Sequence, residues 1–520
     1  MRLRLLCFLL GFSLFANSSR GQSTRGTELW LTFGENLDLL FNGMPNFSVI
    51  VSSPVNTQGA VSIPFTGFSV PFIVTANQPV EVQLPQNIYY GTGDEAIFNF
   101  GVKITANNPV DVFAYHHRLY FSDASIVLPI DEMATEYTVM AQEDLSGNSP
   151  SEFVVLATRD STVLEITPSD VTINFRPPNV PFNVRIDEGQ TFQLQSYGDL
   201  TGSRVRVLSG GKVAVFGGAR QAHVHCLGAD NTLYDECYPI ERSGKFYVTV
   251  PFLGQGGDIF RTLSLQDSCI LSINGTTVPT LNRGEYFDTL LATASTFSST
   301  KLILMSQFNK SQQCNSSMLG DPSMVNLVPL ELKKEDVSWI SLDGPSGQQY
   351  VSSHFVNILT ATSGVNALQL DGNTVNFSPV PSLPGFSFAR VAISSGPHRL
   401  TSPLGFQAVV YGFGDYNAHT FHLGYDDPDS PVGVLDFESD GTLVEWPEGG
   451  SVRITLSDAL LALKGTLRLE LFDATGRSCG SYPLDHRSVQ RLQPELAAGI
   501  YLYRLTSDGE ILTHGKGYLR

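Results

Sequence analysis

The sequence has no second long apolar run after its first twenty residues, no cluster of basic residues, and almost no helix signals before residue 450. A membrane-spanning helix needs about 20 apolar residues, so no later transmembrane segment is expected. Lys and Arg number 32 against 50 Asp and Glu, which gives a net charge of −18. This balance argues against a nucleic-acid partner, because phosphate contacts need clustered cations. We interpret the acidity as a solvated surface that keeps the protein soluble, and an acidic binding face is the less favoured alternative.

Motifs of nucleophilic and metal-dependent catalysis are also missing. The chain has no GxSxG elbow, no HExxH helix and no glycine-rich phosphate loop after a strand. Its cysteines do not have the spacing of paired CxxC zinc ligands, so no metal and no cofactor is expected. Paired carboxylates for glycoside cleavage stay open, because their separation is a three-dimensional property.

The composition favours many short strands. Only 3 Trp are present, but there are 33 Phe and 18 Tyr, together with 47 Gly and 29 Pro. Aromatic side chains pack well on a pleated surface, and Gly and Pro punctuate strands with turns. The sequence therefore predicts an all-β protein.

Four hydrophobic, strand-like stretches end in polar loops that hold most of the histidines. They are PVDVFAYHHRL from Pro109, KVAVFGGARQAHVHC from Lys212, KLILMSQFNKSQQC from Lys301 and FQAVVYGFGDYNAHTFH from Phe406. The spacing is roughly a hundred residues each time, and a fixed long period indicates repeated units with equivalent loops on one face.

Other segments recur in step, such as TELWLTF at Thr27, TEYTVMA at Thr135, GKFYVTV at Gly244 and EDVSWIS at Glu335. One repeat supplies about eight strands, which divide into two four-stranded antiparallel meanders. Four repeats predict a β-propeller-like body of about eight four-stranded blades, with the N-terminal strand completing the last blade. The alternative is a row of tandem β-sandwiches, one per repeat.

Four parts of the chain are expected. Residues 1–21 have the charged start, apolar run and small-residue end of a signal peptide. The repeat body spans 25–425, an acidic linker spans 426–450, and strands separated by turns over 451–520 predict a small Ig-like β-sandwich. Calcium binding by Asp426, Asp427 and Asp429 lacks the spacing of an EF-hand loop, so a solvated linker is favoured.

Export makes disulfides chemically possible. Cys226 and Cys237 flank the short loop CLGADNTLYDEC and are the favoured pair, and Cys269 with Cys314 is a weaker alternative. Cys479 is then left single, as a thiol or, less favoured, in an intermolecular link.

The C-terminal module resembles the sorting domain of proteins exported by the type IX secretion system. The resemblance rests on LRLELFDATGR (467–477), LQPELAAGIYLYRL (492–505) and the terminal HGKGYLR. It implies delivery to the outer surface or medium of a Bacteroidetes-type bacterium, with the secretion machinery as a partner. The signature residues that it implies are Gly499, Ile500, Tyr501, Gly515 and Lys516.

The body, about residues 25–425, resembles the N-terminal domain family of the IgG Fc-binding protein. The resemblance rests on GTELWLTFGEN (26–36), SEFVVLATRDSTVLEITP (151–168) and the run from Lys212 to Arg261. The family name implies binding of immunoglobulin Fc, but no family binding residues carry over to positions of this sequence.

The repeated loops are the expected ligand-binding face of an exported surface protein. The candidate contacts in these loops are His116, His117, Arg118, Arg220, His223, His225, His419 and His422. We expect a binding or adhesion protein for a host or environmental protein or glycan. An extracellular hydrolase and a purely structural surface protein are the alternatives. A competing interpretation of the histidines is that they bond to neighbouring backbone and rim groups.

Overall fold

The computed structural model describes most of the chain. In the body these are residues 23–36, 45–85, 92–345 and 348–426, and in the C-terminal unit 443–445, 451–455, 467–473, 477–485, 489–494, 496, 499–507 and 510–519. The expected signal peptide and most of the expected linker lie outside the described residues. The described residues form strands and three short 3-10 helices, which confirms the all-β prediction.

No helix in the described part of the chain has the length and apolar character to cross a membrane.

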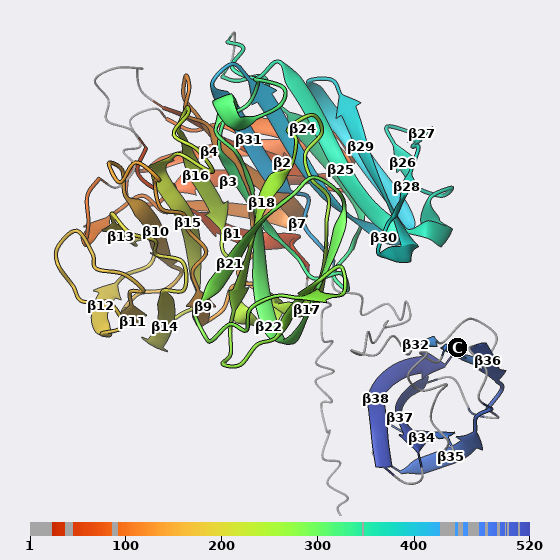
Figure 1. Ribbon diagram of the computed structural model, residues 1–520. Coiled ribbons are helices and arrows are strands. Elements are labelled where there is room, and N and C mark those ends of the chain that lie inside the picture. Colours follow the sequence, from red (N-terminus) through yellow and green to blue (C-terminus); the bar gives the residue numbers. More distant parts are fainter. Residues whose placement is uncertain are drawn as a thin grey trace, which may run out of the picture.

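The first repeat shows how each unit is built (Figure 1). Its long strand β7 (Val102–His117) belongs to two sheets. The first half of β7 lies between β1 and β3, with β4 outside, and its second half lies between β2 and β8, with β5 outside. The chain passes back and forth between the two sheets, with the β3–β4 and β7–β8 pairs each inside one sheet, so neither sheet is a meander. The other strands are β1 (Gly26–Leu31), β2 (Asn46–Ser52), β3 (Thr57–Ile63), β4 (Phe68–Val74), β5 (Val80–Gln83) and β8 (Asp123–Val127).

The next three repeats follow the same plan. The long shared strand is β22 in the third repeat and β30 in the fourth, and in the second it is split into β14 and β15, where Gly210 has a φ of 111°. Strand β6 (Ala96–Phe98) adds to the edge of the second repeat by pairing with β13.

The strands of the second repeat are β9 (Glu136–Thr138), β10 (Ser151–Ala157), β11 (Thr162–Thr167), β12 (Phe182–Ile186), β13 (Thr191–Ser196), β14 (Arg204–Ser209), β15 (Val213–Ala222) and β16 (Asn231–Glu236). Those of the third are β17 (Gly244–Thr249), β18 (Asp258–Ser264), β19 (Leu271–Ile273), β20 (Thr276–Thr277), β21 (Tyr286–Leu291), β22 (Ser295–Asn309) and β23 (Ser323–Leu327). Those of the fourth are β24 (Lys334–Ser341), β25 (Ser353–Ala361), β26 (Gln369–Leu370), β27 (Asn373–Thr374), β28 (Ser378–Val380), β29 (Leu383–Ile393), β30 (Gly396–Gly414) and β31 (Asn417–His422).

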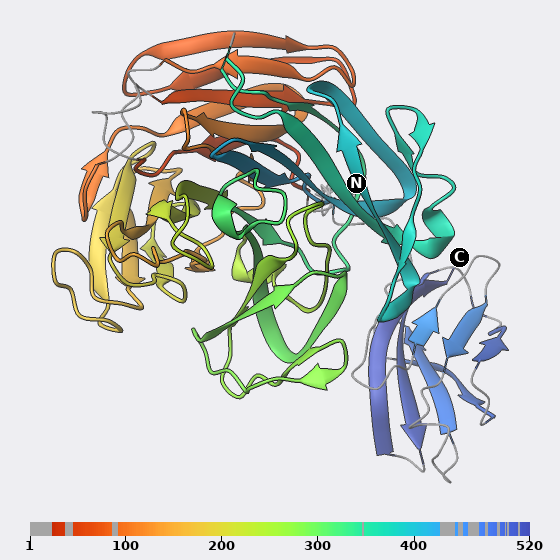
Figure 2. The ribbon, with the colours of Figure 1, turned by 45° about the horizontal axis from the view of Figure 1, so that its top comes forward.

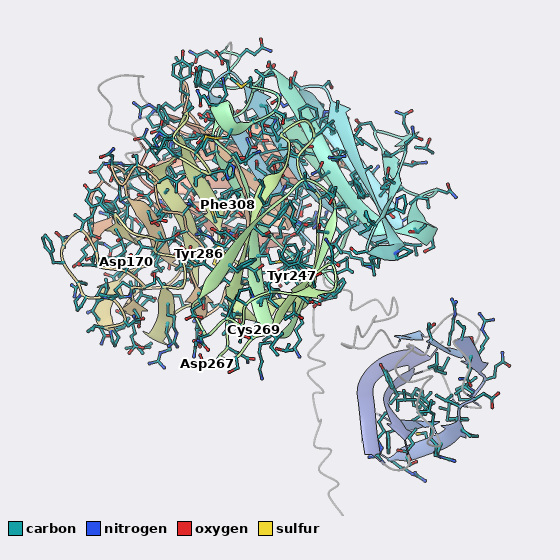
Figure 3. The ribbon with its side chains drawn as sticks, viewed as in Figure 1. Asp170, Tyr247, Asp267, Cys269, Tyr286 and Phe308 are labelled. Carbon is teal, nitrogen blue, oxygen red and sulfur yellow. A yellow bond between two sulfur atoms is a disulfide. The ribbon has the colours of Figure 1, made fainter. Side chains whose placement is uncertain are left out.

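The first strand of every repeat carries a fully buried aromatic residue. These residues are Trp30, Tyr137, Tyr247 and Trp339, and Tyr247 is labelled in Figure 3. The hydroxyls of Tyr137 and Tyr247 each donate a hydrogen bond of 2.8 Å to a backbone carbonyl of the long strand. A buried aromatic ring with a satisfied polar tip anchors a core strongly. The recurring sequence series therefore marks the core of each unit.

The repeats close into a ring around the last strand of each unit. Strand β8 lies against β16 and β31, and β23 lies against the same two strands. Figure 2 shows the four repeats, coloured from orange through yellow and green to blue-green, arranged around this centre. The carboxylate of Asp123 accepts backbone N–H groups from all four central strands, those of Ala124, Tyr234, Met324 and Thr420, at 3.0–3.2 Å. One buried side chain thus joins every repeat.

Neighbouring repeats are also joined by buried ion pairs. Arg261 of the third repeat is 2% exposed and contacts Asp199 of the second repeat and Asp288 of its own, each at 2.7 Å. The Arg261 guanidinium lies 3.9 Å from the ring centre of Tyr286 and 5.4 Å from that of Phe308, two residues labelled in Figure 3. Breaking such a pair leaves an uncompensated buried charge, so the ion pair fixes how the two repeats meet.

The eight-bladed propeller is not confirmed. The prediction that each sheet is a meander is wrong, because strands from distant positions lie side by side in each sheet. The N-terminal strand β1 pairs with β7 of its own repeat and not with the last repeat. The chain ends of the body still meet, since Thr24 donates its backbone N–H to the Tyr425 carbonyl at 2.9 Å. The units are two-sheet bodies, as in the sandwich alternative, but they form a ring and not a row.

The described strands of the C-terminal unit form two antiparallel sheets with one core. Apolar side chains of both sheets, such as Ile454 and Leu469, share this core, as expected for a β-sandwich. The expected signature residues Gly499, Ile500 and Tyr501 open β37, and Gly515 and Lys516 lie on its neighbour β38. One sheet contains β32 (Leu443–Glu445), β33 (Val452–Thr455) and β36 (Val489–Leu492), and the other β34 (Leu467–Asp473), β35 (Ser478–Pro483), β37 (Gly499–Ser507) and β38 (Glu510–Leu519).

Candidate binding site at the loop face

Four equivalent loops lead into the four central strands. They are residues 118–122 before β8, 223–230 before β16, 310–322 before β23 and 415–416 before β31. Because these strands pack together at the centre of the ring, the loops meet at one end of it. We call this surface the loop face.

Hydrogen bonds fix the loops to one another. The side chain of Gln312 donates to the Asp415 carboxylate at 2.9 Å and accepts the backbone N–H of Tyr416 at 2.6 Å, which joins the third and fourth loops. Asn231, the first residue of β16, donates to the Ser122 carbonyl at 2.8 Å and accepts the Ser122 N–H at 2.9 Å, which joins the first loop to the end of the second. The loop face is therefore one connected platform.

A disulfide joins the second and third loops. Cys226 is bonded to Cys314, with a Cα–Cα distance of 6.4 Å. The predicted Cys226–Cys237 bond is wrong, because β16 extends about 20 Å and carries Cys237 away from the loop face. Cys237 is a buried free thiol, and burial raises its pKa to about 12. The weaker prediction of a Cys269–Cys314 bond is also wrong, since Cys269 is free and buried. Cys479 has no disulfide partner among the described residues.

Five of the eight candidate contact residues are closed off from solvent. The side chains of this group are at most 2% exposed, and its members are His116, His117, Arg118, His419 and His422. His116 contacts the Asn36 amide at 3.0 Å, and His422 accepts the Gly424 N–H at 2.9 Å. Burial lowers the pKa of His116, His117 and His422 to about 3. Direct ligand contact at these five positions is not supported, because they build the inside of the ring.

The other three candidates reach the surface. His225 is exposed, and Arg220 and His223 are partly exposed. The His223 ring contacts the Asp144 carboxylate at 2.6 Å. Burial raises the pKa of Asp144, but hydrogen bonds from Ser146 and His223 outweigh this and lower that pKa to about 2. His223 is therefore held in place by a charged partner at the edge of the loop face.

Exposed apolar side chains occupy the loop tips, and the sequence reasoning missed them. Leu119 is 38% exposed, Tyr120 41%, Leu227 70%, Met318 55% and Tyr416 40%. The rings of Tyr120 and Tyr416 meet edge to face at 6.1 Å across the first and fourth loops. The available signal was that each loop sequence contains at least one large apolar residue.

Each loop also holds one non-glycine residue in the left-handed region. The φ angles are 73° for Tyr120, 73° for His225, 54° for Met318 and 54° for Tyr416. This conformation is unfavourable for side chains with a Cβ, and such strain gathers at binding sites. The four repeats share this local geometry although their loop sequences differ.

A hollow of about 500 Å³ lies outside the loop face, against β26, β27 and β29 of the fourth repeat. His398 lines it and contacts Asp371 through Nδ1 at 2.7 Å and the Ser394 carbonyl through Nε2 at 2.9 Å. Both ring nitrogens are occupied, so His398 is part of the wall and does not present a free nitrogen to a ligand.

Comparison with known proteins places the body in a family. A family model described as IgGFc binding protein matches residues 123–412, more than half of the chain. The chain belongs to this family. A human IgGFc-binding protein is 30% identical over 162 residues, which cover 30% of this chain and 3% of the human protein. The chain therefore aligns with a small part of that relative.

Two solved structures give weaker likenesses to this IgGFc-binding family member. Latent PorU from Porphyromonas gingivalis is 13% identical, covers 59% of this chain and 31% of its own, and has a TM-score of 0.13. A biofilm-associated protein BSP domain is 8% identical, and the match covers 95% of this chain and 96% of that domain. Its TM-score is also 0.13. At TM-scores this low, neither likeness informs the fold or the function.

Two carboxylates bear on the hydrolase alternative, Glu152 inside the family segment and Glu35 in the N-terminal part of the body before that segment. Burial raises the pKa of Glu152 well above its ordinary value, and the charge of Glu35 adds to the rise. Gln195 donates to both carboxylates, at 2.8 and 2.9 Å, and Glu152 is 4% exposed. Both carboxylates are therefore satisfied by hydrogen bonds inside the protein.

Proposed function

We propose that this family member is an exported binding protein that recognises a protein partner through the loop face. The observation that carries the proposal is the set of exposed apolar tips, one or more from each repeat, on a platform fixed by hydrogen bonds and a disulfide. Clustered exposed apolar residues mark interaction surfaces, and aromatic residues supply much of their binding energy. A rigid platform loses little conformational entropy on binding.

The identity of the partner is open to a direct assay. The family name points to immunoglobulin Fc, so Fc is one arm of the test, beside arrays of host or environmental proteins and of glycans. Capture of a glycan and no protein would contradict a protein partner.

The loop face is tested with the double variant Tyr120→Ala/Tyr416→Ala. Removal of two neighbouring aromatic anchors is expected to weaken binding of the captured partner by at least about tenfold. Phe175→Ala is the matched control, because Phe175 is 87% exposed and lies between β11 and β12, outside the loop face. Equal binding by all three proteins would contradict the proposed site.

We also propose that residues 451–520 act as a type IX sorting domain that delivers the protein to the cell surface or medium. The support is the resemblance carried by Gly499, Ile500, Tyr501, Gly515 and Lys516, which lie on the paired strands β37 and β38. Deletion of 451–520 in a bacterium with this secretion system is expected to retain the protein inside the cell envelope. Unchanged export of the shortened protein would contradict the proposal.

A further inference from the structure

One buried carboxylate beneath the loop face has no partner. Asp321 precedes β23, its side chain is fully buried, and neither of its oxygens forms a hydrogen bond in the structure. Asp123 and Asp235, buried at the same centre, accept several hydrogen bonds each. An unpaired buried carboxylate is costly, so the Asp321 site needs a neutralising group.

The surroundings of Asp321 are acidic and contain no cation. Among the described residues no lysine or arginine forms an ion pair with it. Burial raises its pKa well above the ordinary value, and the charges of Asp230 and Asp415 add to the rise. The nearby N–H of Gln312 opposes this rise without reaching hydrogen-bonding geometry.

Further unpartnered oxygens belong to the third loop and to the strand ends beside the third and fourth loops. The amide oxygens of Asn309, Asn315 and Asn417 are buried and form no hydrogen bond. Their amide nitrogens donate to backbone carbonyls, and that of Asn309 donates to the carbonyl of Asp321 itself at 2.8 Å. These bonds fix each amide with its oxygen as the free atom.

The two loops are held together at this point. Gly320 donates its N–H to the Gly414 carbonyl at 2.8 Å, and Gln312 bonds to Asp415 at 2.9 Å. Gly320 has a φ of 81°, and a Cβ there would lie 2.5 Å from the Phe413 ring. The third loop therefore approaches the fourth at a position where only glycine fits.

We propose that Asp321 binds a calcium ion beneath the loop face together with the amide oxygen of Asn309, whose nitrogen contacts the Asp321 backbone, and with those of Asn315 and Asn417. Ca²⁺ takes oxygen ligands from carboxylates, asparagine side chains and backbone carbonyls in flexible geometry. Zinc prefers nitrogen and sulfur ligands, which this set of oxygens does not offer. No group of three or more His, Cys, Asp or Glu side chains that could hold a metal ion occurs among the described residues, so the proposed site depends on one carboxylate and amide oxygens. A site with one carboxylate and neutral amide oxygens suits a hard cation, and its loss would unfasten the loop that presents Met318.

The test is calcium binding by the full chain and by Asp321→Asn. For the wild-type protein we expect Ca²⁺ in excess over EDTA to raise Tm by about 2 °C or more. We also expect Tb³⁺ to give luminescence sensitised by a nearby tyrosine and displaced by Ca²⁺. Asp321→Asn keeps the shape and removes the charge, so it should match or exceed the wild-type Tm in EDTA and show neither response. Asp131→Asn, an exposed acid with the same change of charge, should respond as the wild-type protein does.

The opposite results would overturn the proposal. A wild-type protein with no Tm shift and no terbium signal has a protonated Asp321 in place of a bound ion. Equal responses of wild type and Asp321→Asn would show calcium bound elsewhere. If Asp321→Asn does not fold, Asn315→Ala keeps the carboxylate and removes one oxygen, and its affinity for Tb³⁺ should fall by about tenfold or more. Unchanged affinity in Asn315→Ala would then overturn the proposal.

Discussion

The carboxylate of Asp123 accepts the backbone N–H of Met324 at 3.1 Å across the centre of the ring, although 201 positions separate them in the chain. The same carboxylate accepts an N–H from each of the other three central strands. Four donors from four repeats thus depend on one side chain. The packing of the repeats and the position of their loops are coupled through it.

Asp123→Asn should destabilise the body. Asparagine keeps one acceptor oxygen but turns an N–H group toward backbone N–H donors, so at least one donor loses its partner. We expect the free energy of unfolding to fall by about 3–5 kcal/mol in urea denaturation. Asp131→Asn makes the same chemical change at an exposed position and should stay within about 0.5 kcal/mol of wild type. Equal midpoints for the two variants would show that the central hydrogen bonds contribute little.

The disulfide should stabilise the loop face and be recoverable by peptide mapping. Cys226 and Cys314 are 88 residues apart, and closing such a loop typically stabilises a fold by about 2–4 kcal/mol. Dithiothreitol is expected to lower the unfolding midpoint of the wild-type protein and to leave that of Cys226→Ala/Cys314→Ala unchanged. Mapping without reductant should link the peptides that contain these two cysteines. A link from Cys226 to Cys237 would contradict the structure.

Acid should destabilise the protein through its buried histidines. Burial lowers the pKa of His117 to about 3, so below about pH 6.5 the unfolded chain takes up a proton that the folded chain does not. Folding stability from this group is therefore lost as pH falls from about 6.5 toward 3. His117→Phe should recover about 2 kcal/mol of unfolding free energy at pH 5 relative to pH 7.5.

Asp235 should change folding stability with pH in the opposite direction to His117, and it serves as the comparison. Burial raises its pKa to about 7, so the folded chain takes up its proton first and gains stability as pH falls from 7 toward 4. Asp235→Asn should remove this gain and make the loss of stability in acid steeper. Parallel pH profiles for wild type and both variants would contradict the burial of these groups.

Backbone strain at the loop tips should be visible in a pair of substitutions at Tyr416. Its φ of 54° is easy for glycine and unfavourable for any residue with a Cβ. Tyr416→Gly and Tyr416→Ala both lose the ring contact with Tyr120, so the difference between them reports the backbone. We expect the glycine variant to be more stable by about 1 kcal/mol in urea denaturation. A less stable glycine variant would show that the tip is not strained.

Much of the organisation follows from sequence periodicity. The alternation of apolar and polar residues predicted strands, and the recurrence of TELWLTF-like and PVDVFAYHHRL-like segments predicted four units with equivalent loops. The buried aromatic residues Trp30, Tyr137, Tyr247 and Trp339 explain why the first of these segments recurs. Patterns of this kind survive in a single sequence because they arise from contacts between a strand and its own core.

The order of strands and the fate of individual side chains were decided only by the tertiary structure. A strand such as β7 can serve two sheets because its halves pair with different neighbours, and nothing in its own residues names them. Cys226 bonds to Cys314 and not to the nearer Cys237 because an extended strand separates positions that are close in sequence. His117 and His419 lie inside the ring while Tyr120 and Tyr416 face outward. The four repeats pack around one centre, and this packing decides which side chains of each loop are buried. It depends on contacts between residues far apart in the chain, so local sequence patterns do not reveal it.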